Sequence, residues 1–180
     1  MPTQATCKPV SFKLSLAVLA LAGAIAIPAG AASDTAAASA TVIVPIAIAK
    51  AVDLAFGKFA PGAGGTVTVS TNGTRTVSGA ILSTNGSSPT AARFNVTGEA
   101  SATYAITHSG TTDLTSGSDT MALAKFSDLT AGGATSGTAA TGALSGGGAQ
   151  SIYVGGTLTV GAAQPTGTYT GTVIVAVEYN

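Results

Sequence analysis

The sequence predicts an all-β protein, an antiparallel β-sandwich that follows an N-terminal signal helix. Three observations lead to this fold class. Short runs of β-branched and apolar residues alternate with polar residues at a period of two. Turn residues such as Asn72-Gly73 separate these runs, and no stretch after residue 32 shows the apolar period of a helix. Strands that follow one another without helices between them pair antiparallel.

The first 32 residues have the pattern of an export signal. Two lysines precede the apolar run Leu14–Ile27, and Ala29-Gly30-Ala31 follows as a cleavage site of small residues. We expect cleavage after Ala31 or Ala32, with an uncleaved membrane anchor as the alternative. The run is short for a membrane span, so we expect no transmembrane span after cleavage. The mature protein would then act in the periplasm, at the surface or outside a Gram-negative-type bacterium.

The composition argues against several classes of function. Charged residues make up 8% of the chain, against about 25% in an average protein, so a basic face for nucleic acid is not expected. The single cysteine, Cys7, lies in the signal, so the mature chain has no disulfide. The single histidine, His108, is expected in a solvated turn at a strand end. We therefore expect no enzyme, no cofactor and no metal site.

The predicted strands are separated by turn residues along the whole mature chain. Asn72-Gly73 is the strongest hairpin signal, and it joins the second and third strands of the list below. Leu114–Gly117 is expected as a turn, and the Ala/Gly-rich stretch Ala131–Ala149 as a long surface loop around Leu144. The expected strands cover residues 41–49, 66–70, 74–82, 93–97, 102–107, 120–129, 151–160 and 168–179.

The segment at residues 33–49 can be an N-terminal extension or the first strand of the β-sandwich domain, which we expect to cover residues 50–180. Four apolar side chains alternate along one face of this segment, namely Val42, Val44, Ile46 and Ile48. Pro45 cannot donate a hydrogen bond to a central ladder, so it places the segment at an edge or a break.

The last strand has the most regular alternation in the chain. Tyr169, Val173, Val175, Val177 and Tyr179 share one face of residues 168–179, and small or polar residues fill most of the other. On this pattern alone, a terminal core strand is the simpler interpretation.

Several segments together resemble known bacterial families. The spacing from Gly167 to the penultimate Tyr179 resembles the C-terminal motif of chaperone–usher pilus subunits, which pairs with a periplasmic chaperone. The run Val52–Phe59 resembles the L-x-F-G-x-hydrophobic opening of archaic, spore-coat-U-like pilin domains. With Ala92–Gly98, Tyr104–Ile106, Gly155–Val160 and Gly167–Gly171, the whole mature chain is similar to an exported bacterial β-sandwich family of unassigned function.

The resemblance implies an immunoglobulin-like, pilin-like β-sandwich fold. It also implies a structural surface protein that assembles by β-strand addition. In such pilins, the N-terminal extension of one subunit fills a groove in the next. Val42, Val44, Ile46 and Ile48 would then anchor the donated strand, and Gly167, Tyr169, Val173, Val175, Val177 and Tyr179 would form the assembly strand. Copies of itself or related subunits, and a chaperone, are the implied partners. The alternatives are that residues 41–49 pair within their own chain, and that the protein is a self-contained module that binds a ligand or glycan.

Overall fold

The computed structural model describes residues 30–180. The predicted signal helix lies in residues 1–29, outside the described residues. The described part of the first unit, residues 30–40, is exposed and has no regular secondary structure. Residues 41–180 form the second unit, which contains all the strands and is described below.

The second unit consists of twelve strands, and no helix occurs within residues 30–180. Every strand pairs antiparallel with its neighbours. The prediction of an all-β, antiparallel sandwich is therefore confirmed. The strands are β1 (Ala47–Val52), β2 (Phe59–Ala60), β3 (Gly65–Val69), β4 (Arg75–Ser78), β5 (Ile81–Leu82), β6 (Ala92–Thr97), β7 (Thr103–Gly110), β8 (Asp113–Ser116), β9 (Asp119–Asp128), β10 (Thr141–Ala143), β11 (Ala149–Val160) and β12 (Val173–Tyr179).

The long strand β11 is the centre of the larger sheet. Along one edge it pairs first with β6 and then with β3, and along the other edge it pairs with β9. β1 extends the sheet beyond β6, and β4 extends it beyond β3. The β3–β4 hairpin turns at Asn72-Gly73, as the sequence predicts.

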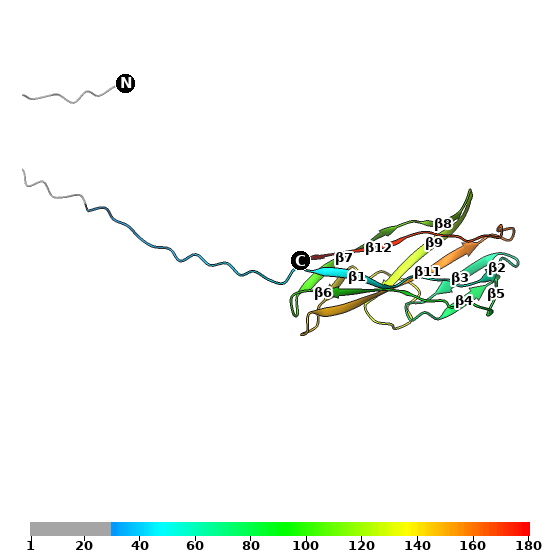
Figure 1. Cartoon of the computed structure of the whole chain (residues 1–180), viewed down its shortest axis with the longest axis horizontal. Helices are drawn as coiled ribbons and strands as arrows, with labels where there is room; N and C mark the ends of the chain where they lie inside the picture. Colours follow the sequence, from blue (N-terminus) through cyan, green and yellow to red (C-terminus); the bar gives the residue numbers. More distant parts are fainter. Residues whose placement is uncertain (1–29) are drawn as a thin grey trace, which may run out of the picture. The chain divides into compact units, whose positions relative to one another are not determined.

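The smaller sheet has the order β10-β7-β12 and is joined to the larger one through β8 and β9. β8 pairs with β9, and a bridge between Thr115 and Thr170 continues the pairing of β12 beyond β7. The strands therefore run around the domain in the order β12, β7–β8, β9, β11, β6 and β1. β12 and β1 end this series, and Figure 1 shows them side by side near the C terminus.

The inward-facing side chains form two core clusters. Core cluster 1 lies around β6, β7 and the first half of β11, and consists of Ala92, Phe94, Val96, Tyr104, Ile106, Leu144, Ile152, Val154 and Val175. Core cluster 2 lies around β3, β9 and the second half of β11, and consists of Phe56, Val67, Val69, Ala80, Met121, Leu123, Leu158 and Val160. β11 contributes to both clusters because its alternating inward residues run the length of the sheet.

Three sequence predictions are wrong in their details. Leu114–Gly117 is not only a turn, since residues 113–116 form β8 and Gly117 turns into β9 with a φ of 61°. Leu144 is 3% exposed, because the predicted surface loop returns as β10 and places it in core cluster 1. The single strand predicted over residues 74–82 is divided into β4 and β5 at Gly79, whose φ is 81°.

His108 is not a solvated turn residue. It lies within β7, and its Nε2 is 3.0 Å from both the Ser127 Oγ on β9 and the Ala139 carbonyl. The Ala139 N–H also donates to the Ser127 Oγ, at 2.9 Å. These contacts hold the connection between β9 and β10 against the sheets, and Ser127 itself is buried.

Tyr104 carries a polar atom that core cluster 1 does not satisfy. The residue is fully buried, and within the described residues its hydroxyl has no hydrogen-bond partner. The ring lies across Gly142 of β10, where a Cβ atom would be 2.5 Å from the hydroxyl oxygen. Burial raises the pKa of the Tyr104 phenol, because the charged form loses its solvation.

We expect Tyr104→Phe to leave the free energy of unfolding unchanged or to raise it by about 1–2 kcal/mol, since it removes an unsatisfied buried group. The unfolded phenol ionises near pH 10, before the folded one does, so the wild type loses stability as the pH rises above about 10. The Tyr104→Phe variant should lose less stability than the wild type over this pH range. Urea unfolding at pH 7 and pH 10.5 measures both effects, and a large loss of stability at pH 7 would contradict the first.

Candidate functional site

β12 and β1, the two ends of the strand series, lie next to each other, and we call the line between them the seam. The seam is closed at one end of the domain and open at the other. Near the C terminus the two strands contact each other. Beyond them, residues 54–61 and residues 164–173 diverge and enclose a groove of about 760 Å³. The groove thus lies between segments from opposite ends of the domain sequence, and both belong to the family-like motifs noted above.

The first wall, residues 54–61, is fixed by Arg75 of β4. The Arg75 Nη1 donates to the carbonyls of Phe56 and Lys58, at 2.8 and 3.1 Å, and to the Ser87 Oγ at 2.9 Å. Its Nη2 donates to the Ser83 carbonyl, at 3.0 Å. One planar guanidinium therefore ties the wall to the loop that follows β5.

Glycines make room for these wall contacts. Gly57 has a φ of 71°, and a Cβ there would meet the Ser87 Oγ and, at 2.5 Å, the Arg75 Nη1. A Cβ at Gly156 would lie 3.0 Å from the Phe56 ring and 2.9 Å from Leu123. The pair Phe56-Gly57 therefore allows the ring to reach the sheet while the backbone stays close to Arg75.

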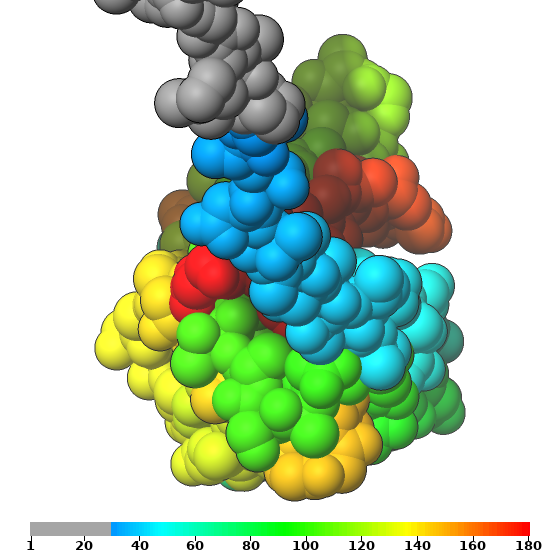
Figure 2. All heavy atoms as spheres, turned by 90° about the vertical axis from the view of Figure 1, so that its left-hand side faces the viewer, coloured from blue at the N-terminus to red at the C-terminus, as the bar shows by residue number. Residues whose placement is uncertain are grey.

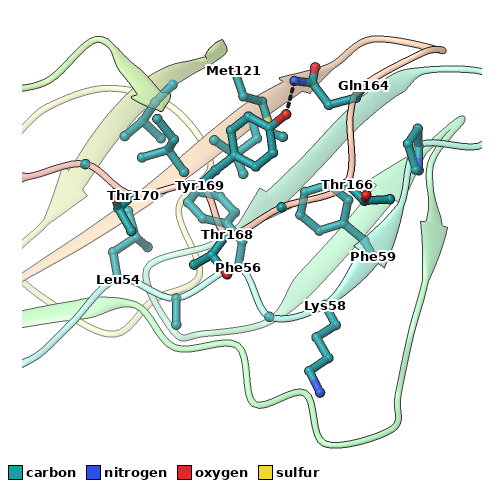
Figure 3. A pocket seen from close by; sticks show the side chains of 18 of the residues that line it. Leu54, Phe56, Lys58, Phe59, Met121, Gln164, Thr166, Thr168, Tyr169 and Thr170 are labelled. Carbon is teal, nitrogen blue, oxygen red and sulfur yellow. Dashed lines mark hydrogen bonds between the residues drawn. The ribbon is translucent and has the colours of Figure 1, made fainter. Parts of the chain in front are cut away.

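The second wall, residues 164–173, is fixed by bonds to β8 and by its own side chains. The backbones of Thr170 and Thr115 exchange hydrogen bonds of 2.9 and 2.8 Å. The Tyr169 hydroxyl donates to the Pro165 carbonyl at 2.9 Å and accepts from the Gln164 Nε2 at 2.8 Å. The latter bond is the dashed line in Figure 3.

The groove is apolar inside and nearly uncharged. Its floor is made by side chains around core cluster 2, and in Figure 3 the rings of Phe56, Phe59 and Tyr169 lie close together above it. Lys58 is the one charged residue among those that line the groove, and its side chain points away from the rings. The floor residues are Leu114, Met121, Leu123 and Leu158.

Both walls also present backbone groups that bond to no other described residue. On the first wall these are the N–H and C=O of Leu54 and the N–H of Phe56. On the second wall they are the N–H and C=O groups of Tyr169 and Gly171, between the bonded groups of Thr170 and Thr172. Unpaired backbone groups in an extended segment can accept another strand.

The closed end of the seam is held by three residues, which we call the Val44 junction. The Val44 N–H donates to the Glu99 Oε2 at 3.0 Å, and its carbonyl accepts from the Tyr179 hydroxyl at 2.8 Å. The Glu99 N–H donates to the same hydroxyl, at 2.6 Å. Figure 2 shows this end, with the red C-terminal residues against the chain that leads into β1 and against the green β6–β7 connection. Gly98 lacks the Cβ that would collide with Tyr179.

The structure separates the four predicted donor anchors into two groups. Ile46 and Ile48 pack against core cluster 1 of their own chain, and β1 begins at Ala47, later than the predicted strand. Val42 is 96% exposed and makes no bond to a described residue. Val44 is 55% exposed, but the Val44 junction holds its backbone.

The six predicted assembly-strand residues also fall into two groups, according to what they contact. Gly167, Tyr169 and Val173 line the groove, whereas Val175, Val177 and Tyr179 pack against core cluster 1 within β12. Regular pairing of β12 begins only at Val173. The sequence did not point to Arg75, whose role depends on carbonyls distant in the chain. The nearest sequence signal for it is Gly57, which gives the guanidinium space.

Within residues 30–180, no helix is long and apolar enough to cross a membrane. In the same residues, no three His, Cys, Asp or Glu side chains are grouped so that they could hold a metal ion.

One comparison with known proteins finds a family to which the domain belongs. A family model described as "Domain of unknown function (DUF4402)" matches residues 46–179. No curated protein and no solved structure matches the chain. The matched region begins two residues after Val44, so it covers β1 to β12 and both walls of the groove.

Proposed function

The chain belongs to the DUF4402 family, whose description assigns no function, and from this premise we propose that it is an exported structural protein whose copies assemble by β-strand addition. The groove at the open seam would receive the added strand. The N-terminal extension of a second copy would supply it.

The observation that supports this proposal is the pair of groove walls with free backbone groups. A small apolar ligand would use the floor, but it would leave the N–H and C=O groups of Tyr169, Gly171 and Leu54 without partners. An added strand uses both, because its backbone bonds to the walls while alternate side chains cover the floor. The groove therefore suits a peptide strand better than a compact ligand.

The extension has the properties that a donated strand needs. Residues 41–43 make no hydrogen bond to the rest of the second unit, and Val42 and Ile43 are 96% and 49% exposed. A contact between the extension of one copy and the groove of the next is head-to-tail, so it propagates as a fibre. The resemblance to chaperone–usher pilins adds a periplasmic chaperone as a transient partner of the same groove.

The proposal is tested by the size of the assembled protein. We expect residues 33–180, expressed with an added N-terminal export signal, to form a concentration-dependent series of oligomers in sedimentation velocity and ladders on unheated denaturing gels. The matched control replaces residues 33–43 by a Gly/Ser segment of equal length. It should be a folded monomer, because it keeps every strand and loses the donated side chains.

The proposal would be overturned if both proteins were monomers at concentrations up to the millimolar range. It would also be overturned if both formed the same oligomers, since residues 33–43 would then have no part in the contact.

A further inference from the structure

The Val44 junction is the first point along the described chain at which the backbone is hydrogen-bonded to the β-strand core of its own copy. We infer that residues from Val44 onward stay in their own domain, and that residues 36–43 form the strand given to the next copy. This strand runs antiparallel to β12, with its even-numbered side chains on the groove floor. The inference rests on the proposed function, and it names the donated segment, its direction and its facing.

The boundary follows from the bonds that hold the chain on either side of it. Both backbone groups of Val44 are bonded to Glu99 and Tyr179 of the same copy. Beyond it, Ile46 and Ile48 pack in core cluster 1, and β1 pairs with β6. A strand that included these residues would have to break the junction and the β1–β6 ladder, whereas residues up to Ile43 can be donated without loss of a described bond.

A copy cannot fill its own groove with the same residues. Tyr179 holds Val44 at the closed end of the seam, and the groove begins at Val173, six residues earlier along β12. At about 3.3 Å per residue this separation is about 20 Å. Six of the eight residues from 36 to 43 would be used to reach the groove, and only two would lie in it. The strand that fills the groove must therefore come from another copy.

The direction follows from the lack of a linker. Ile43 is joined directly to Val44, so the donor's domain begins where its donated strand ends. If the strand ran parallel to β12, it would end near Val173, and the donor's domain would overlap β1 and β12 of the receiving copy. If it runs antiparallel, it ends near Gln164, at the far end of the groove. The two domains then meet end to end.

The facing follows from the residue types. From Ala36 to Val42 the even-numbered residues are all apolar, whereas the odd-numbered ones include Ser39 and Thr41. The groove floor is apolar, so the even-numbered residues face it. Eight residues also match the first wall, residues 54–61, in length.

Disulfide trapping tests the direction and the facing of the strand without assuming a register. The chain after the signal has no cysteine, so pairs can be introduced one at a time. Donor positions 39, 41 and 43 are combined with positions 168, 170 and 172 on the receiving wall. These three threonines belong to the groove lining, but their residues are exposed and alternate with the inward Tyr169, so we expect their side chains on the outer face. After mild oxidation, dimers are scored on non-reducing gels. Val42→Cys with Thr170→Cys is the matched control, because its two side chains are expected on opposite faces.

We expect the pairs that form to have a constant sum of residue numbers, as an antiparallel ladder requires, and the control pair to stay reduced. A constant difference would mean a parallel strand and would overturn the inferred direction. If the control pair formed dimers and the pairs at odd-numbered donor positions did not, the inferred facing would be overturned.

A second arm tests the boundary. Ala47 and Thr97 are exposed partners in the β1–β6 ladder, so Ala47→Cys with Thr97→Cys should close within one copy in assembled protein. A disulfide between copies at this pair would overturn the boundary at Val44. In contrast, failure of the wild type to assemble would overturn the proposed function itself, so the two failures are distinguishable.

Discussion

Val42→Asp is expected to abolish assembly, whereas Ile43→Asp, one residue later, should weaken it only slightly. Val42 is the largest of the even-numbered side chains from 36 to 42, and its burial contributes about 1.5–3 kcal/mol. A carboxylate at the same place would also be desolvated against an apolar floor, and Lys58, the charged residue of the lining, points away from that floor. A loss of at least about 3 kcal/mol weakens the contact at least about 100-fold.

Each of the two variants controls for the other, since they add the same charge to adjacent exposed positions. Val42 makes no bond to a described residue, so the monomer's free energy of unfolding should stay within about 0.5 kcal/mol of the wild type. Sedimentation velocity over a range of concentrations gives the association constant, and urea unfolding gives the stability. Equal assembly by the two variants would show that side-chain facing does not decide the contact.

Arg75→Ala is expected to destabilise the domain by about 2–4 kcal/mol and to disorder the first wall of the groove. The guanidinium donates to three carbonyls and one hydroxyl, and a hydrogen bond to a charged group contributes about 1.5–3 kcal/mol net. Arg75 is only partly buried, so water replaces part of these bonds in the variant and the loss is smaller than their sum. Without these bonds, residues 56–58 keep only two hydrogen bonds to the loop at 83–87, from the Lys58 N–H to the Ser87 Oγ and from the Ser83 N–H to the Lys58 carbonyl. Assembly should also be weaker in this variant, because the added strand needs an ordered first wall to bond to.

Arg75→Lys is the informative companion variant. It keeps the charge, but an ammonium cannot bond to all four acceptors in the geometry of the planar fork. We therefore expect most of the stability loss of the alanine variant. Faster amide exchange at residues 54–60 should accompany it, while β7 and β12 remain protected. Wild-type stability in the lysine variant would show that the charge, rather than the fork, holds the wall.

The period-two pattern was enough to predict the strands because it reports which side chains face the core. β6, β9, β11 and the β3–β4 hairpin lie close to their expected positions, since their alternating residues and the Asn72-Gly73 turn are local signals. Leu144 and β8 were missed for the opposite reason. Their surroundings are small or polar in sequence, and only pairing with β7 and β9 makes them part of the fold.

The groove could be predicted only in part. Both of its walls were noticed as motifs, around Phe56 and around Tyr169, but no local pattern shows that they face each other. That arrangement depends on the order of strands around the domain, which leaves β1 and β12 as its two ends. The Val44 junction could not be predicted from the sequence either, because it joins residues 44, 99 and 179, which are far apart in the chain, through single hydrogen bonds.

The Val44 junction also determines how the domain would respond to a mechanical load. Tension on residues before Val44 passes into β1 along the strand axis, so it shears the β1–β6 ladder and loads its hydrogen bonds together. Peeling, by contrast, would break them one at a time. The bonds from Glu99 and Tyr179 share the load at the point of entry. A pulled domain should therefore resist extension until these bonds and the ladder fail in a single high-force event.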